Sequence, residues 1–170
     1  MENLDTYILG QDSHQLNLQS SADNVAVTLA MLRQTRRTVD IFSRQLDGRL
    51  YDKSEFITLM GQLASRQPRV RIRILLKQVE PLVSHNHRII ELSRKLSSSI
   101  HIRLVHENYK EYNQAFMIFD DRGVIKRQLA DRYEGIASFN DPMTARPLGA
   151  FFDEVWEISQ PDPNLRRLYI

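Results

Sequence analysis

Residues 112–140, which read YNQAFMIFDDRGVIKRQLADRYEGIASFN, decide the fold that we predict for this chain. Within them, the apolar run Gln114 to Phe119 is short enough for a buried strand. A turn follows at 120–123, and its final glycine can take the positive φ that other residues resist. Val124 to Leu129 reads as a second strand and Gly135 to Phe139 as a third. The stretch therefore predicts a central hairpin followed by one further strand.

Outside this stretch, helix and strand signals alternate. Apolar residues at helical spacing, capping residues and prolines predict helices, and β-branched or alternating apolar runs predict strands. In chain order we expect a helix from Ser20 or Ser21 to Arg37, a strand at Thr38 to Ser43, a helix from Asp52 or Ser54 to Gln67, a strand at Val70 to Leu76, a helix at Pro81 to Ser97, a strand at Ile100 to Val105 and, last, a helix at Arg146 to Ile158 with Pro147 in its first turn. The alternation predicts an α/β fold with a mixed, largely parallel central sheet flanked by helices.

Size and composition indicate one domain. The chain has 170 residues, of which 42% are hydrophobic, and this suits a sizeable core. We place the domain at residues 21–159, between an N-terminal tail or edge strand at 1–20 and a C-terminal tail at 160–170. Within the first 20 residues, Tyr7 to Leu9 is the expected edge strand, and 11–19 is polar enough for a loop.

Several classes of protein are excluded by composition. The chain has no cysteine, so it has no disulfide and no thiolate metal site. Met1 to Asp5 has neither the basic start nor the apolar core of a signal peptide. The apolar runs are shorter than the roughly 20 residues that a membrane span needs. We therefore expect a cytoplasmic location. The formal net charge of +2 does not by itself indicate a nucleic-acid binder.

The core stretch resembles the motif of phospholipase D-like phosphodiesterases. That family carries a His, a Lys two residues later and an Asp five residues beyond the Lys, and then a small residue, Ser, any residue and Asn. Asp120 stands at the Asp position, and residues 137–140 are similar to the trailing motif, with Ser138 and Asn140 in its polar places. Counting back from Asp120, the His position is Asn113 and the Lys position is Ala115.

The order of elements is also similar to one repeat of the phospholipase D-like fold, over about residues 22–158. The aromatic-rich segment Phe151 to Trp156 resembles the ending of the family's repeat. The chain is identified as a single degenerate repeat, and an uncharacterised subgroup known chiefly from bacteria is most similar to it. Because enzymes of the family assemble one site from two repeats, the resemblance implies a symmetric homodimer.

In the family, the His attacks a phosphodiester phosphorus and the Lys stabilises the phosphoryl oxygens. Asn113 has no ring nitrogen to attack, and Ala115 supplies no charge. The resemblance therefore implies a domain without phosphodiesterase activity that acts as a binding or regulatory module. Asp120, Ser138 and Asn140 are then mainly structural. Asn113, Ser138 and Asn140 are nevertheless the residues that we expect beside a phosphate-containing ligand.

An active phosphodiesterase with a relocated histidine remains an alternative. His106 lies just past a predicted strand end, where loops often carry function, and is the rescue nucleophile in this hypothesis. Lys126 is the replacement cation. If residues 121–122 form a two-residue turn, Met117 pairs with Lys126 and Ala115 with Gln128, so that Lys126 shares a face with the vacated Lys position.

Binding of nucleic acid or another acidic partner is a third hypothesis, and solvation is the simpler interpretation of the same residues. Basic residues form three small clusters, and no aromatic residues interleave with them as in single-strand platforms. The clusters are Arg33, Arg36 and Arg37; Arg69, Arg71 and Arg73; and Arg166 and Arg167. His85-Asn86-His87 resembles a metal pair, but residues two apart on a helix point to different sides. We expect no metal and no cofactor.

Overall fold

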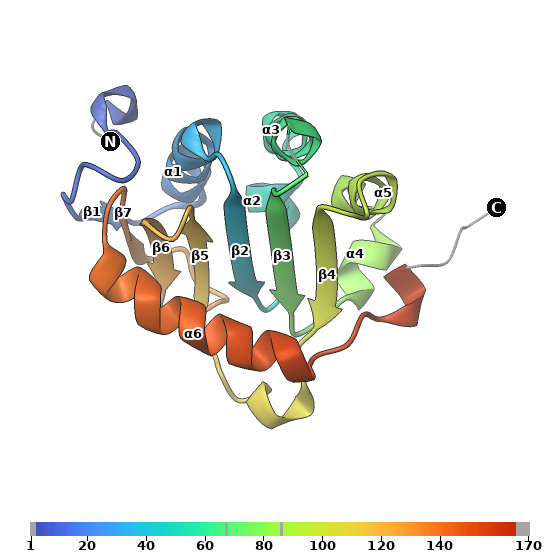
Figure 1. Cartoon of the computed structure of the whole chain (residues 1–170). Helices are drawn as coiled ribbons and strands as arrows, with labels where there is room; N and C mark the ends of the chain where they lie inside the picture. The colour runs from blue at the N-terminus through green and yellow to red at the C-terminus, as the bar shows by residue number, and fades with distance from the viewer. Residues whose placement is uncertain (1–2, 67, 86, 166–170) are drawn as a thin grey trace.

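A seven-stranded sheet in the order β1-β7-β6-β5-β2-β3-β4 forms the middle layer of the computed structural model (Figure 1). The structure describes residues 3–66, 68–85 and 87–165, so the predicted cluster Arg166 and Arg167 lies outside the described residues. The strands are β1 (Leu16–Leu18), β2 (Thr38–Ser43), β3 (Arg71–Leu76), β4 (Ile100–Leu104), β5 (Ala115–Phe119), β6 (Gly123–Arg127) and β7 (Gly135–Ser138).

The predicted α/β fold with a mixed sheet and flanking helices is confirmed. Parallel pairing is confined to β2, β3 and β4, whereas β5, β6, β7 and β1 join the sheet by antiparallel pairing. The sheet is therefore less parallel than we predicted. The reason is that the chain returns after β4 without a crossover helix and then builds the hairpin β5–β6 and the strand β7 beside β2.

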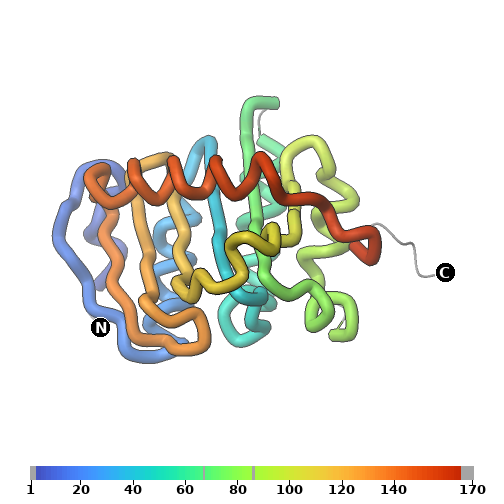
Figure 2. The backbone as a smooth tube through the Cα atoms, turned by 90° about the horizontal axis from the view of Figure 1, so that it is seen from below, coloured from blue at the N-terminus to red at the C-terminus, as the bar shows by residue number. Residues whose placement is uncertain are grey.

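Helices cover both faces of the sheet, unequally. α1 (Ser21–Gln34), α2 (Gly48–Tyr51), α3 (Ser54–Arg66), α4 (Glu80–Ser84) and α5 (Arg88–Lys95) lie on one face, and α6 (Pro142–Ile158) crosses the strands alone on the other (Figures 1 and 2). Three single-turn 3₁₀ helices are η1 (Leu4–Thr6), η2 (Glu107–Tyr109) and η3 (Pro163–Leu165). Among the described residues, no helix combines the length and the apolar character that crossing a membrane requires.

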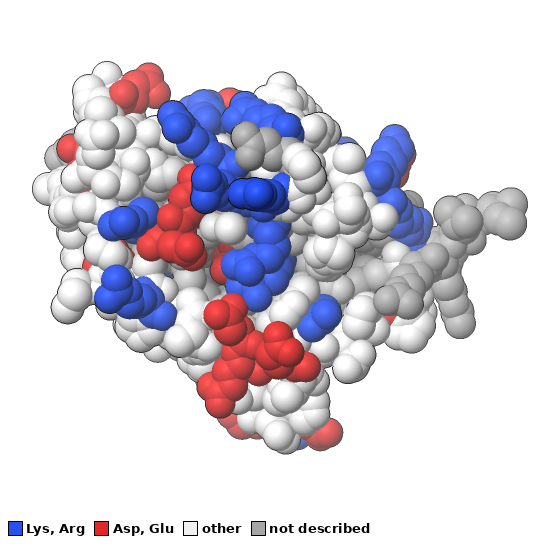
Figure 3. Space-filling model, in the orientation of Figure 1, with Lys and Arg blue, Asp and Glu red and all other residues white. Residues whose placement is uncertain are grey.

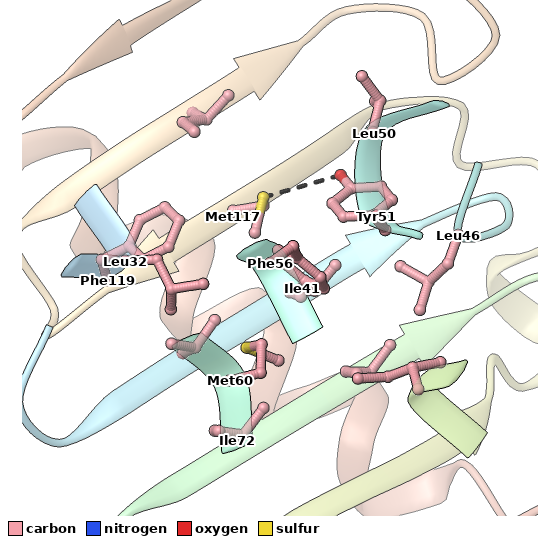
Figure 4. Close-up of a cluster of buried hydrophobic side chains, with 14 of the residues drawn as sticks. Leu32, Ile41, Leu46, Leu50, Tyr51, Phe56, Met60, Ile72, Met117 and Phe119 are labelled. Atoms are coloured by element: carbon pink, nitrogen blue, oxygen red, sulfur yellow. Dashed lines mark hydrogen bonds between the residues drawn. The ribbon is translucent and has the colours of Figure 1, made fainter. Parts of the chain in front are cut away.

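Two hydrophobic clusters result from this arrangement, because alternate strand residues point to opposite faces. The larger cluster lies under α1, α3 and α5. Figure 4 shows part of it, in which Leu32, Phe56 and Met60 from the helices meet strand residues such as Ile41 and Ile72. The smaller cluster lies under α6, where Phe42, Phe116 and Phe152 are among the buried residues.

A buried ion cluster joins the sheet to α6. The Arg73 guanidinium donates to both carboxylate oxygens of Asp40, at 2.9 and 3.1 Å, and to Asp153 at 2.7 Å. It also lies 4.8 Å from the Phe152 ring centre and 5.6 Å from that of Trp156. Arg73 is therefore a structural residue, although its neighbour Arg71 on the same strand face is exposed.

Three predicted elements differ in the structure, and the structure contains one helix that we did not predict. The edge strand lies at Leu16–Leu18 and not at Tyr7 to Leu9, because Leu16 and Leu18 are the buried pair that packs on β7. The unpredicted helix is α2. The predicted helix at 81–97 is two helices. α4 ends at Ser84, and a ring nitrogen of His87 caps the start of α5 by accepting from the Ile89 backbone N–H.

The last helix begins earlier than predicted. Asp141 caps it by accepting from the Thr144 backbone N–H at 3.1 Å, and Pro142 takes the first turn. Pro147 therefore lies inside α6. The helix tolerates it because Pro147 and Met143 are both exposed, so the carbonyl left without a partner can be hydrated.

Candidate anion-binding site

Cations gather where the parallel strands end. We call the side of the sheet at which β2, β3 and β4 end its carboxyl end, and the opposite side its amino end. Arg44 directly follows β2 and Lys77 directly follows β3, and the register pairs Ser43 with Leu76, so the two cations are neighbours. A hollow of about 390 Å³ lies here, lined by Arg44, Lys77, Gln78, Val105, Lys110 and Asn113. Ligands of open α/β sheets bind outside the carboxyl ends of the strands.

Lys77 is held in the hollow by two polar groups of the chain. Its Nζ donates to the backbone carbonyl of Tyr112 at 2.8 Å and lies 3.4 Å from Oδ1 of Asn113. Burial lowers the pKa of Lys77, and the charge of Arg44 lowers it further, whereas Glu111 acts in the opposite direction. In the described part of the chain, no carboxylate forms an ion pair with Lys77. A bound anion would offset both causes of the lowered pKa.

Asn113 is the predicted site residue that the structure places in this hollow. It precedes β5, and its backbone carbonyl accepts from the Ala130 N–H at 2.8 Å, which fixes the chain on that side. Its side-chain oxygen faces Lys77, so the amide NH₂ group remains to donate. The residue at the His position can therefore bind an anion next to a lysine, although it cannot act as a nucleophile.

The residue that pairs with Ala115, at the Lys position, is not the one that we predicted. Phe119 pairs with Gly123 and Ala115 with Arg127, so the turn has three residues and the predicted register is wrong by one. Asp120 and Asp121 both have left-handed φ values, 51° and 58°, and this lengthens the turn. Lys126 consequently pairs with Phe116 on the α6 face, away from Ala115.

Arg127 is the cation opposite Ala115, and it is buried. Its guanidinium donates to the backbone carbonyls of Ala130 at 3.3 Å and Arg132 at 2.7 Å. Arg127 therefore organises the connection between β6 and β7 and is not among the residues that line the hollow.

Asp120, Ser138 and Asn140 lie at the amino end, opposite Asn113. Val124 pairs with both Ile118 and Ser138, whereas the partners at the carboxyl end are Ala115 and Arg127. The predicted grouping of Asn113, Ser138 and Asn140 around one phosphate is therefore wrong. The trailing motif lies at the end of the predicted third strand, β7. This strand runs in the same direction as β5, so its end is opposite Asn113.

The three displaced residues have structural partners. The Asp120 carboxylate accepts from the backbone N–H groups of Arg36, Arg37 and Thr38 at 2.8, 2.8 and 3.0 Å. Ser138 accepts from the Asn140 backbone N–H at 3.3 Å, and the Asn140 amide donates to Ser13 at 3.2 Å.

The histidines do not form a second centre. His106 caps η2 because its Nδ1 accepts from the Asn108 backbone N–H at 3.1 Å, and it does not line the hollow. His85 is exposed at the end of α4, whereas His87 is buried. Within the ranges that the structure describes, no group of three or more His, Cys, Asp or Glu residues is placed to hold a metal ion.

The three cations of the hollow were absent from our predicted site residues, namely Arg44, Lys77 and Lys110. A sequence signal for two of them exists. Arg44 follows the predicted strand Thr38 to Ser43, and Lys77 follows the predicted strand Val70 to Leu76. Two cations directly after neighbouring parallel strands must lie close together at the carboxyl end.

Comparison with known proteins supplies a family and a fold. The family model described as Domain of unknown function (DUF7931) matches residues 20–168. No curated protein matches the sequence. NucT from Helicobacter pylori is a similar solved structure, with 15% identity, a TM-score of 0.63, and coverage of 88% of this chain and 98% of that chain. Nuc from Salmonella typhimurium, described as a phospholipase D family member, has 12% identity, a TM-score of 0.61, and coverage of 86% and 97%.

TrmBL2, described as an archaeal chromatin protein that shows a novel mode of DNA binding, is also similar. It has 16% identity and a TM-score of 0.62, and the match covers 87% of this chain but 54% of that chain, so the present chain spans about half of TrmBL2. At these identities the likeness shows the fold alone. The predicted phospholipase D-like fold is thereby confirmed.

Proposed function

The chain belongs to the family described as Domain of unknown function (DUF7931), and we propose that it acts as a binding or regulatory module that holds a phosphate-containing anion at the carboxyl end of its sheet and lacks phosphodiesterase activity. One observation carries the proposal. Lys77, with a pKa lowered by burial and by Arg44, lies against the side-chain oxygen of Asn113 in a hollow of about 390 Å³.

The chemistry of the hollow suits binding better than turnover. Arg44, Lys77 and Lys110 supply positive charge, and the Asn113 amide supplies a neutral donor. Charge-assisted hydrogen bonds from such groups to phosphate oxygens are about twice as strong as neutral ones. Among the described residues that line the hollow, none is a histidine, a serine or a carboxylate, so the hollow lacks the side chains that usually attack phosphorus.

The alternative of a relocated histidine receives no support from the position of His106. The Nδ1 lone pair of His106 already accepts a backbone N–H, so in this tautomer its other nitrogen carries the proton. Attack on phosphorus would require the ring to leave this cap and enter a hollow that it does not line.

Titration of the ¹⁵N-labelled protein with inorganic phosphate, followed by NMR, tests the proposal. We expect shifts of the Asn113 side-chain amide and of the backbone around Lys77. The variant Arg44→Ala/Lys77→Ala should weaken binding by at least about tenfold, because it removes hydrogen bonds to charge that are worth about 1.5–3 kcal/mol each. Arg49→Ala/Lys53→Ala is the matched control, since both residues are exposed and neither lines the hollow.

Hydrolysis of bis(p-nitrophenyl) phosphate tests the absence of activity. We expect no turnover above the buffer rate. Turnover that is lost in His106→Ala would establish the relocated histidine and overturn the proposal, and equal loss of phosphate binding in the two double variants would refute the assigned site.

A symmetric homodimer remains a prediction. In the resemblance on which it is based, two repeats complete one site, and the hollow described above is formed by one chain. Sedimentation at micromolar concentration measures the mass directly, and a monomer would contradict the prediction.

A further inference from the structure

Five exposed arginines gather at the amino end of the sheet, opposite the candidate site. Two connections supply them, the one between α1 and β2 and the one between α3 and β3. The residues, which we call the arginine band, are Arg36, Arg37, Arg66, Arg69 and Arg71. The two connections meet, because the Arg71 backbone N–H donates to the Arg37 carbonyl at 2.9 Å. Figure 3 shows the resulting cationic band over the amino ends of β2 and β3, with acidic groups beside it.

The side chains of the arginine band make no hydrogen bond or ion pair in the described part of the chain, although the charge of Arg71 opposes the rise that burial causes in the pKa of Asp40. Other arginines do form ion pairs. Arg33 pairs with Glu55, Arg88 with Asp52, and Arg73 with Asp40 and Asp153. For the band, the hydrogen bonds found within the described ranges are made by backbone groups only. Five like charges that stay close together without intramolecular partners repel one another, and an external polyanion would relieve this repulsion.

The backbone under Arg36, Arg37 and Arg71 is held by hydrogen bonds. The Asp120 carboxylate accepts from the N–H groups of Arg36, Arg37 and Thr38, and β2 pairs with β3 from Thr38 and Arg71 onward. A ligand therefore orders only the side chains when it binds, and the entropic cost of binding is lower than it would be on a loose loop.

We propose that the arginine band binds the phosphate backbone of double-stranded nucleic acid without reading its sequence. Guanidinium groups match phosphate oxygens in two-point hydrogen bonds, and every cation of the band is an arginine. Segments 35–38 and 65–71 contain no aromatic residue on which unpaired bases could stack, so the band lacks the main feature of single-strand binders. This surface lies at the other end of the sheet from the hollow, and the inference does not depend on the proposed function.

Fluorescence anisotropy of a labelled DNA duplex of about 20 base pairs, titrated with the full chain, tests the proposal. We expect a dissociation constant of roughly 1–100 μM and a slope of log K against log salt of about −4, because each neutralised phosphate contributes about −0.9. Arg37→Ala/Arg71→Ala should weaken binding about tenfold and reduce the magnitude of the slope by about 2.

Arg49→Ala/Arg132→Ala is the control, because it removes the same charge from exposed positions outside the band. It should leave the slope unchanged, as should Arg44→Ala/Lys77→Ala, which tests the hollow separately. If Arg37→Ala/Arg71→Ala lowers the melting temperature, Arg66→Ala/Arg69→Ala provides a second pair with the same expected loss.

Three results would overturn the proposal. The first is binding that is insensitive to salt. The second is an equal loss in the Arg49→Ala/Arg132→Ala control. The third is competition by poly-glutamate or by a mixed-sequence single strand that matches or exceeds competition by unlabelled duplex.

Discussion

The two ends of the sheet are both cationic, but they are built differently. At the carboxyl end, Arg44, Lys77 and Lys110 surround a hollow, and Lys77 is held by a backbone carbonyl and by Asn113. At the amino end, the arginine band is exposed, and its side chains make no hydrogen bond or ion pair among the described residues. Backbone hydrogen bonds hold Arg36, Arg37 and Arg71.

This difference separates two kinds of anion binding. A hollow with a partly buried lysine gains most from a compact anion that replaces lost hydration. An exposed band gains from a polymer that presents many phosphates at once and releases counterions. Substitutions test this difference between the two ends. Some should affect both ends, and others should affect only the amino end or only the carboxyl end.

Arg73→Ala should affect both ends and should have the largest effect. Burial raises the pKa of Asp40, and the hydrogen bonds from Arg73 oppose that rise. Without Arg73 the Asp40 carboxylate is left buried and uncompensated, so we expect urea unfolding to show a loss of about 3–5 kcal/mol. Asp153→Asn should cost at most about 1 kcal/mol, because the Asp153 side chain is 62% exposed. A loss of about 1 kcal/mol or less in Arg73→Ala would show that the buried pair of Arg73 and Asp40 does not stabilise the fold.

Asp120→Ala should act on the amino end. Three backbone N–H groups lose a charged acceptor, and since water replaces part of it we expect a loss of about 2–4 kcal/mol in unfolding free energy. Duplex binding should weaken, and phosphate binding should not. Asp121→Ala is the matched control, because Asp121 has a similar φ of 58°. Equal losses in both variants would mean that the turn conformation, and not the cap on Arg36 and Arg37, stabilises this end.

Alkaline titration should separate the two ends without weakening the fold. The pKa of Lys77 is lowered, so its ammonium loses its proton at a lower pH than an ordinary lysine, whereas arginine remains charged. As the pH is raised toward the ordinary lysine pKa of about 10.4, phosphate affinity should therefore fall by up to roughly tenfold while duplex affinity stays constant. Lys77→Arg should abolish the fall, and a fall that persists in Lys77→Arg would assign it to another group.

The titration of His87, at the carboxyl end, should have the smallest effect on the unfolding free energy. Burial lowers its pKa, so the unfolded chain binds a proton more readily than the folded one. The contribution of neutral His87 is present above about pH 6.5 and is lost as the pH falls below it, at about 1.4 kcal/mol per unit of pKa difference. His87→Asn keeps a good cap for α5 without titrating, and unfolding free energies from about pH 7 to about pH 5 should diverge between the two proteins. Parallel curves would disprove the linkage.

Local signals predicted much of the fold. Apolar runs located β2 to β5. Ser20 or Ser21 was predicted as a helix cap from residue type, and Ser20 is the cap, in a capping box with Asp23. β1 escaped prediction because only Leu16 and Leu18 mark it, and two apolar residues in a polar segment form no periodic pattern.

The candidate site was predicted only in part, because strand pairing and direction decide which residues meet there. Asn113 was found by its position in a linear motif, but Ser138 and Asn140 were grouped with it by spacing alone. The third strand was predicted, but its direction was not considered. Because β6 lies between them, β7 runs in the same direction as β5, so the end of β7 lies at the opposite end of the sheet from Asn113. Lys77 approaches Asn113 only through pairing between β2, β3 and β5, which no local pattern encodes.

The pairing of Ala115 with Arg127 has a consequence for protein engineering. Installing a His–Lys pair at positions 113 and 115 would place a lysine on a buried strand directly across from a buried arginine, at a Cβ separation of about 5 Å. The lysine ammonium and the arginine guanidinium would repel each other there, and the guanidinium already holds the connection between β6 and β7. Restoring the reactive pair is therefore a coupled redesign of three positions, in which the residue on the facing strand must change first.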